Sequence, residues 1–104
     1  NASIEPSLAA GAAGTLYLAW ADARNGNFEI YVLTHTGGGW QMLAGSAQNG
    51  GVSNTLRSSR RPSLALAASG TPVVAWTEFS ANGSDILAAR YDAAANGGAG
   101  GWVA

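Results

Sequence analysis

The sequence predicts an all-β protein made of two copies of one four-stranded antiparallel unit, and two observations lead to this prediction. The first is an internal similarity. A shift of 56 residues places Pro62-Ser63-Leu64-Ala65 on Pro6-Ser7-Leu8-Ala9, and Ala75-Trp76 on Ala19-Trp20. The second is the pattern within each copy, where short apolar runs rich in β-forming residues are bounded by clusters of glycine, serine and asparagine. A helical solenoid is disfavoured because glycine and β-branched residues interrupt every candidate helix.

The similarity between the copies extends over most of their length. It runs without a gap to about residue 36, after which the second copy has about six extra residues around Ala93 to Gly98. The register returns at Gly39-Trp40 and Gly101-Trp102. Tandem similarity of this kind is the sequence signature of a repeat architecture.

The first two strands of each copy are expected to form a hairpin. The first strands are predicted at Ser7 to Ala10 and at Ser63 to Ala67, and the second strands at Leu16 to Trp20 and at Val73 to Thr77. The loops between them contain glycine, which accepts the positive φ angles that tight hairpin turns require.

Two further strands complete each copy. The third strands are predicted at Glu29 to Thr34 and at Asp85 to Tyr91. The fourth strands begin at Trp40 and Trp102, each after a glycine-rich turn. Four short strands in a repeat of about 40–55 residues are typical of a β-propeller blade.

The chain is therefore divided into two expected blades and a linker. Residues 1–44 form the first blade, the polar and glycine-rich residues 45–61 form the linker, and residues 62–104 form the second blade. A blade alone cannot bury both faces of its sheet, and propeller rings usually close with about four to eight blades. We therefore expect a homo-oligomer, a trimer or tetramer of two-blade chains, or else further blades of the same chain.

The composition indicates that much of the surface of this chain is covered by neighbouring repeats or subunits, and it excludes several classes of function. Charged residues make up 11% of the 104 residues, against about 25% in ordinary soluble domains. The formal net charge of −1 leaves no basic stripe for nucleic acid. There are no cysteines, which excludes disulfides and thiolate metal sites, and no apolar run approaches the length of about 20 residues that spans a membrane.

The pattern P-S-L-A, then G, A-W, an acidic residue, I-Y-V or I-L-A and finally G-G-W resembles tandem repeats of secreted bacterial β-propellers of the sialidase (Asp-box) and kelch-like groups. The resemblance implies an extracellular or cell-surface bacterial protein. It implies little about activity, because this scaffold carries lectins, hydrolases and docking platforms alike. The Asp-box itself is degenerate: the segment from Thr34 to Trp40 has Thr36 where aspartate is expected.

No catalytic residues are predicted. Sialidase catalysis needs an arginine triad, a Tyr/Glu pair and an acidic aspartate, and Arg24 and Arg90 do not occupy equivalent repeat positions. A glycosidase carboxylate pair would have to be Asp22 with Glu29 or Glu78 with Asp85. We therefore expect a non-catalytic, lectin-like unit without cofactor or metal. The alternatives are a scaffold fragment of a larger secreted enzyme and a purely structural or engineered oligomer.

Polar residues crowd the connection between the second and third strands of each copy, where propellers often bind ligands. Oxygen-rich loops also bind calcium, although the spacing here fits no established calcium loop, and solvated turns use the same residues. Trp20 and Trp76 either pack between blades or form a stacking platform for a sugar ring. With carbohydrate as the first ligand class, the candidate ligand-binding residues are Asp22, Arg24, Asn25, Glu29, Trp40, Glu78, Asn82, Asp85 and Trp102.

Overall fold

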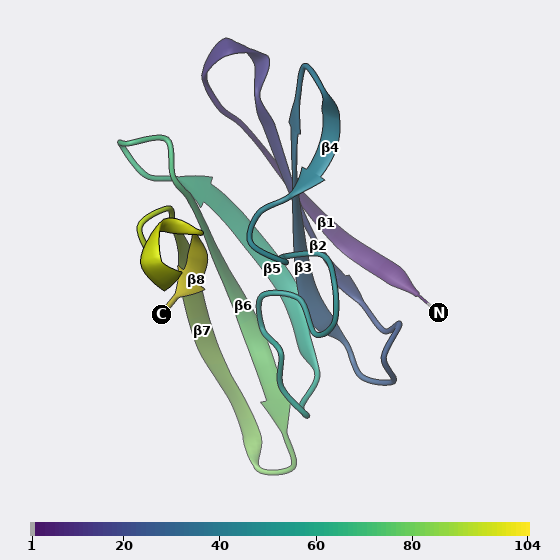
Figure 1. The fold of residues 1–104 in the computed structure, drawn as a ribbon. Coiled ribbons are helices and arrows are strands. Elements are labelled where there is room, and N and C mark those ends of the chain that lie inside the picture. Colours follow the sequence, from purple (N-terminus) through teal and green to yellow (C-terminus); the bar gives the residue numbers. More distant parts are fainter. Residues whose placement is uncertain (1) are drawn as a thin grey trace.

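The computed structural model describes residues 2–104, which form two separate four-stranded antiparallel sheets (Figure 1). The first sheet contains, in spatial order, β1 (Ser3–Ala10), β2 (Leu16–Asp22), β3 (Glu29–Thr36) and β4 (Gly39–Met42). The second sheet contains, in the same order, β5 (Ser59–Leu66), β6 (Pro72–Ser80), β7 (Gly83–Asp92) and β8 (Gly101–Val103). The predicted all-β class with two four-stranded antiparallel sheets is therefore confirmed.

Two short 3-10 helices lie in the connections between strands: η1 (Ala12–Gly14) between β1 and β2, and η2 (Asn96–Gly98) between β7 and β8. Among residues 2–104, no helix combines the length and the apolar character required to cross a membrane.

The strands β1 and β5 begin earlier than predicted, at Ser3 and Ser59, because each contains a β-bulge. The pairing register shifts just before the proline of each strand, where Glu5 and Arg61 take φ angles of 58° and 57°. Proline cannot donate a ladder hydrogen bond and so predicts the start of an edge strand. The extra residue of a bulge carries the strand past that point.

The connection between the second and third strands differs between the sheets, although the sequence predicts equivalent loops. In the first sheet, residues 23–28 form a wide loop between β2 and β3. In the second sheet the ladder continues to the pair Ser80 and Gly83, which leaves only Ala81 and Asn82 in the turn. The two predicted ligand-binding loops therefore have different shapes.

Side chains alternate between the two faces of each sheet, and the pairing registers assign them. We call one face of each sheet the tryptophan face. It carries Leu8, Leu18, Trp20 and Leu33 in the first sheet, and Leu64, Val74, Trp76 and Ala89 in the second. We call the opposite face the alanine face. It carries Ser7, Ala19, Ala21, Ile30 and Val32 in the first sheet, and Ser63, Ala75, Thr77, Ile86 and Ala88 in the second.

The core lies between unlike faces of the two sheets. The tryptophan face of the second sheet, with Val74 and Trp76, packs on the alanine face of the first sheet, with Ala19 and Ile30. The other two faces point outward and no sheet of the chain covers them, so Leu8 on the first sheet is 62% exposed and Ile86 on the second is 73% exposed. At the Asp22 end of the first sheet, the linker covers part of this face, and Tyr31 is fully buried there.

The linker folds back along the edge of the first sheet beside β3. The backbone N–H of Val32 donates to the Ser46 carbonyl at 3.0 Å, and the N–H of Val52 donates to the Ile30 carbonyl at 2.7 Å. Gly51, with a φ of 66°, lies so close to the Ile30 carbonyl that a Cβ atom would collide with it. The linker is therefore packed against the sheet.

Candidate functional site

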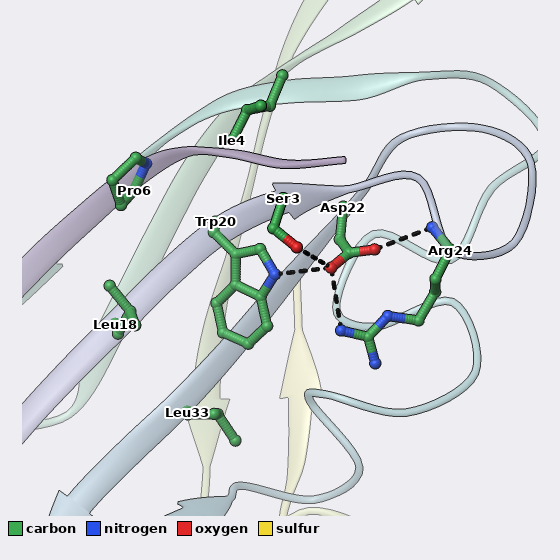
Figure 2. Close-up of a pocket in the computed structure, with 8 residues that line it drawn as sticks. All are labelled: Ser3, Ile4, Pro6, Leu18, Trp20, Asp22, Arg24 and Leu33. Carbon is green, nitrogen blue, oxygen red and sulfur yellow. Dashed lines mark hydrogen bonds and ion pairs between the residues drawn. The ribbon is translucent and has the colours of Figure 1, made fainter. Parts of the chain in front are cut away.

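The most extensive polar network of the first sheet surrounds Asp22, the last residue of β2 (Figure 2). Its carboxylate accepts hydrogen bonds from the Ser3 hydroxyl at 2.6 Å and from the Trp20 indole N–H at 3.1 Å. Arg24 adds its guanidinium Nη2 at 3.1 Å and its backbone N–H at 2.9 Å. The Arg24 guanidinium, together with the Ser3 and Trp20 donors, outweighs burial and holds the pKa of the Asp22 carboxyl well below its usual range.

Beside this network lies a hollow of about 400 Å³ in the tryptophan face of the first sheet. Figure 2 shows its lining, in which Leu18, Leu33 and the Trp20 ring provide an apolar wall next to the polar corner at Asp22. The remaining lining residues are Ser3, Ile4, Pro6 and Arg24. The hollow is thus part of the uncovered sheet face.

Arg24 has little capacity left for a ligand. Its guanidinium lies 4.2 Å above the centre of the Tyr31 ring, and its Nη1 donates to the Ala47 carbonyl at 3.2 Å. With the Asp22 ion pair, these contacts hold the loop after β2 against the linker. Arg24 therefore acts mainly as a structural residue.

Asn25 and Glu29 also bind the linker. The Asn25 side-chain amide donates to the Asn49 carbonyl. One Glu29 oxygen accepts a hydrogen bond from the Ser53 hydroxyl at 2.7 Å, and the other accepts the Thr55 backbone N–H at 2.8 Å. Burial raises the pKa of Glu29, against the effect of these hydrogen bonds.

The paired carboxylates Asp22 and Glu29 therefore do not present a catalytic arrangement. They are cross-strand partners, and their pKa values move in opposite directions, as those of an acid and a base do in some enzymes. However, all four of their oxygens accept hydrogen bonds from the protein. Both carboxylates are also buried, so their chemistry is that of structural anchors.

The second sheet places the corresponding residues differently. Glu78 is buried within β6, where its Oε1 has no hydrogen-bond partner within residues 2–104 and Arg57 lies 3.8 Å from its Oε2. Asn82 and Asp85 are exposed at the far end of the β6–β7 hairpin. The predicted residues of the second sheet are therefore divided between its buried interior and its exposed hairpin.

The two tryptophans of the outermost strands also differ. Trp40 is 47% exposed, and its ring meets the His35 ring edge-on at a centroid distance of 4.9 Å. Trp102 is half-buried, and its indole N–H donates to the Leu43 carbonyl at 2.9 Å. Trp40 is thus the more accessible aromatic surface.

Sequence reasoning missed the structural role of most of these polar residues. Asp22 and Glu78 were expected in the connection after the second strand, but each lies within a strand and is buried. Glu29 was predicted at the start of the third strand and lies there, but its burial was not predicted. The partners of Glu29 and Glu78 are more than 20 residues away along the chain, so local composition could not identify them. Asp22 is different, because Trp20 and Arg24 lie two residues before and after it and could have been recognised as partners from their spacing along the strand. In the described part of the chain, no three side chains of histidine, cysteine, aspartate or glutamate gather in a way that could hold a metal ion.

Comparison with known proteins adds no assignment. No protein-family model matches the chain, and neither the curated proteins nor the solved structures contain a significant match to it.

Proposed function

We propose that this chain is a non-catalytic β-propeller unit whose two sheets are blades, and that it self-assembles into a ring that binds a ligand. The observation that supports this proposal is the stacking of unlike faces. The second sheet uses its tryptophan face to cover the alanine face of the first. One tryptophan face and one alanine face are therefore left without a partner sheet in the chain. These two faces could pack on each other, between copies, in the same way as the internal pair.

Stacking of unlike faces is heterologous, so it continues from copy to copy until the rotation between sheets closes a ring. Three chains would give six blades and four chains eight, both within the usual range for propellers. The low content of charged residues fits a chain whose outer faces are covered by its own kind.

Carbohydrate is the first ligand class for this ring, and Trp40 supports it. Its exposed ring offers an apolar surface of the kind that stacks on a sugar. Trp102, at the equivalent position of the covered second sheet, is still only half-buried, so Trp40 would keep part of its ring accessible after assembly. By its resemblance to secreted propellers, the protein is proposed to act outside the bacterial cell.

The assembly is tested by light scattering coupled to size-exclusion chromatography at several protein concentrations. We expect one discrete mass, that of a trimer or a tetramer. A monomer at every concentration, or a broad distribution of masses, would count against the ring. The broad distribution would favour the alternative that these sheets are scaffold from a larger secreted enzyme.

The carbohydrate proposal is tested separately with a glycan array. We expect the wild-type ring to retain a subset of glycans and the Trp40→Ala variant to lose up to about tenfold in affinity, since stacking on one aromatic ring contributes about 0.5–1.5 kcal/mol. Leu56→Ala is the matched control, because Leu56 is 98% exposed in the linker. Equal binding by wild type and Trp40→Ala would remove Trp40 from the site.

A further inference from the structure

One hydrogen bond between the two sheets of the chain fixes how the sheets are aligned with each other. The backbone N–H of Leu64 in β5 donates to the hydroxyl of Ser7 in β1 at 3.1 Å. Around this hydrogen bond, Leu64 and Trp76 of the second sheet pack with Ala19 and Ile30 of the first. A serine on the alanine face therefore fixes the position of a leucine on the tryptophan face.

The residues that make this contact recur on the uncovered faces. On the alanine face, Ser63, Ala75 and Ile86 of the second sheet stand where the first sheet has Ser7, Ala19 and Ile30. On the tryptophan face, the first sheet has Leu8 and Trp20 where the second sheet has Leu64 and Trp76. Each uncovered face thus repeats the chemistry of the face that is already covered.

At one position on each face, the side-chain volumes change in opposite directions. The tryptophan face of the first sheet has Leu33 where the second has Ala89, so it is larger at that position. The alanine face of the second sheet has Ala88 where the first has Val32, so it is smaller at that position, although it is larger at Thr77, where the first has Ala21. Close packing needs such compensation, and it favours the pairing of these two outer faces with each other.

Charge is complementary across the same pair of faces. Within the chain, Glu5 of the first sheet meets Arg60 at 3.0 Å and accepts the backbone N–H of Arg61 at 2.8 Å. At a contact between copies, Arg61 would occupy the place of Glu5, and the next copy would place Ile4 and Glu5 where Arg60 and Arg61 stand within the chain. The ion pair of Glu5 with Arg60 therefore has no counterpart there. The approach of the Arg61 Nε to Glu5 at 4.0 Å would recur with the two charges exchanged, so one pair of opposite charges meets in both contacts.

We propose that the occupant of the uncovered tryptophan face is a second copy of this chain, and that its second sheet docks there through its alanine face in the register of the internal contact. In this register the Leu8 N–H donates to Ser63 Oγ of the next copy, and Trp20 packs on its Ala75. The inference rests on the proposed ring and specifies its seam. The hollow beside Trp20 is then filled by the neighbouring copy.

The seam is tested by blocking one face at a time. Leu8→Arg places a charge on the tryptophan face, and Ile86→Arg places one on the alanine face. Both positions are largely exposed, so the fold should tolerate the change, and Leu56→Arg in the linker is the matched control. We expect each blocked variant alone to be monomeric, the control to keep the wild-type mass, and an equimolar mixture of the two blocked variants to form a 1:1 dimer.

The outcomes separate the seam from the ring. If both blocked variants keep the wild-type mass, the proposed contact between copies is wrong, but the ring is not excluded. If Ile86→Arg alone forms a dimer, the copies meet through two tryptophan faces instead. Polydisperse wild type, with a 1:1 dimer from the mixture, would support the seam and overturn the ring. A monomeric wild type with no dimer in the mixture would overturn both.

The register is tested by cross-linking in a chain that has no native cysteine. A variant that combines Leu8→Cys with Ser63→Cys should form disulfide-linked multimers under mild oxidation. Ser7→Cys combined with Leu64→Cys is the internal comparison, because that pair should cross-link within one chain. If the internal pair cross-links and the first variant stays monomeric on a non-reducing gel, the proposed register is wrong.

Discussion

The two sheets carry a serine, a tryptophan and an acidic residue at matched positions, but the polar groups of these residues are bonded in one sheet and unpartnered in the other. In the first sheet, Ser3 and Trp20 donate to Asp22, whose buried carboxylate is fully bonded on a face that no second sheet of the chain covers. In the second sheet, the Ser59 hydroxyl, the Trp76 indole N–H and the Glu78 Oε1 are buried, and none has a hydrogen-bond partner within residues 2–104.

The comparison shows how position in the stack changes the role of equivalent residues. The tryptophan face of the second sheet is covered, so its tryptophan contributes by burial, and its unpartnered polar groups cost stability. The corresponding face of the first sheet is open within the chain, so its tryptophan contributes mainly through the network at Asp22. Substitutions at matched positions should therefore have unequal effects.

The largest inequality is expected between the two tryptophans. Trp76 is only 5% exposed in the core, and Trp76→Ala should lower the free energy of unfolding by about 3–5 kcal/mol. Trp20→Ala removes a partly exposed ring and one hydrogen bond, so we expect about 1–2 kcal/mol. Both are measured by urea unfolding in the Leu8→Arg background, in which the face around Trp20 stays uncovered. Equal losses would mean that the two faces are covered alike.

A second difference separates the matched acidic residues Asp22 and Glu78. Asp22→Asn should cost about 2 kcal/mol at neutral pH, because the amide cannot accept from all the donors around it. The folded-state pKa of Asp22 is lowered, so its stabilisation is present above the unfolded value of about 4 and is lost as the pH falls below it. The gap between wild type and variant should therefore narrow in acid. Glu78→Gln is the matched control and should cost much less, and a gap that does not change with pH would contradict the role of the Asp22 charge.

Glu29 should show the opposite dependence on pH. Its folded-state pKa is raised, chiefly by burial, so ionisation weakens the folded state as the pH rises above the unfolded value of about 4.3. Glu29→Gln removes that penalty. The stability of the variant relative to wild type should therefore increase from acid to neutral pH. Denaturation curves at both pH values test this, and a relative stability that falls over the same range would contradict it.

Sequence patterns predicted the elements of this fold better than the contacts between them. The apolar runs around Trp20 and Trp76 gave both second strands, because burial and β-propensity are local signals. The bulge at Glu5 was missed, since the proline after it predicts a strand boundary. The roles of Asn25 and Glu29 were missed as well, because their partners at Asn49, Ser53 and Thr55 come from a linker whose path depends on tertiary packing. Two identical tryptophans could not be told apart by sequence, because their difference arises only when the sheets stack.

The smallest expected effect is also the most direct test of the comparison between the sheets. Glu78 has one methylene more than Asp22, and its Oε1 has no partner, whereas the shorter Asp22 is bonded to both of its neighbours. Glu78→Asp should allow the Ser59 hydroxyl and the Trp76 indole N–H to bond the carboxylate as in the first sheet. This would raise the free energy of unfolding by about 0.5–1 kcal/mol.

The reciprocal substitution is the control for this last prediction. Asp22→Glu should lose stability by a similar amount, because the longer side chain displaces the carboxylate from Ser3 and Trp20. The measurement is paired urea unfolding of both variants with wild type. Stabilisation by Glu78→Asp together with destabilisation by Asp22→Glu would show that side-chain length at this position decides whether the buried serine and tryptophan are satisfied. A loss of stability in both variants would instead mean that each sheet is best served by the acidic residue it already has. In the second sheet, a group outside residues 2–104, such as water, would then bind Glu78.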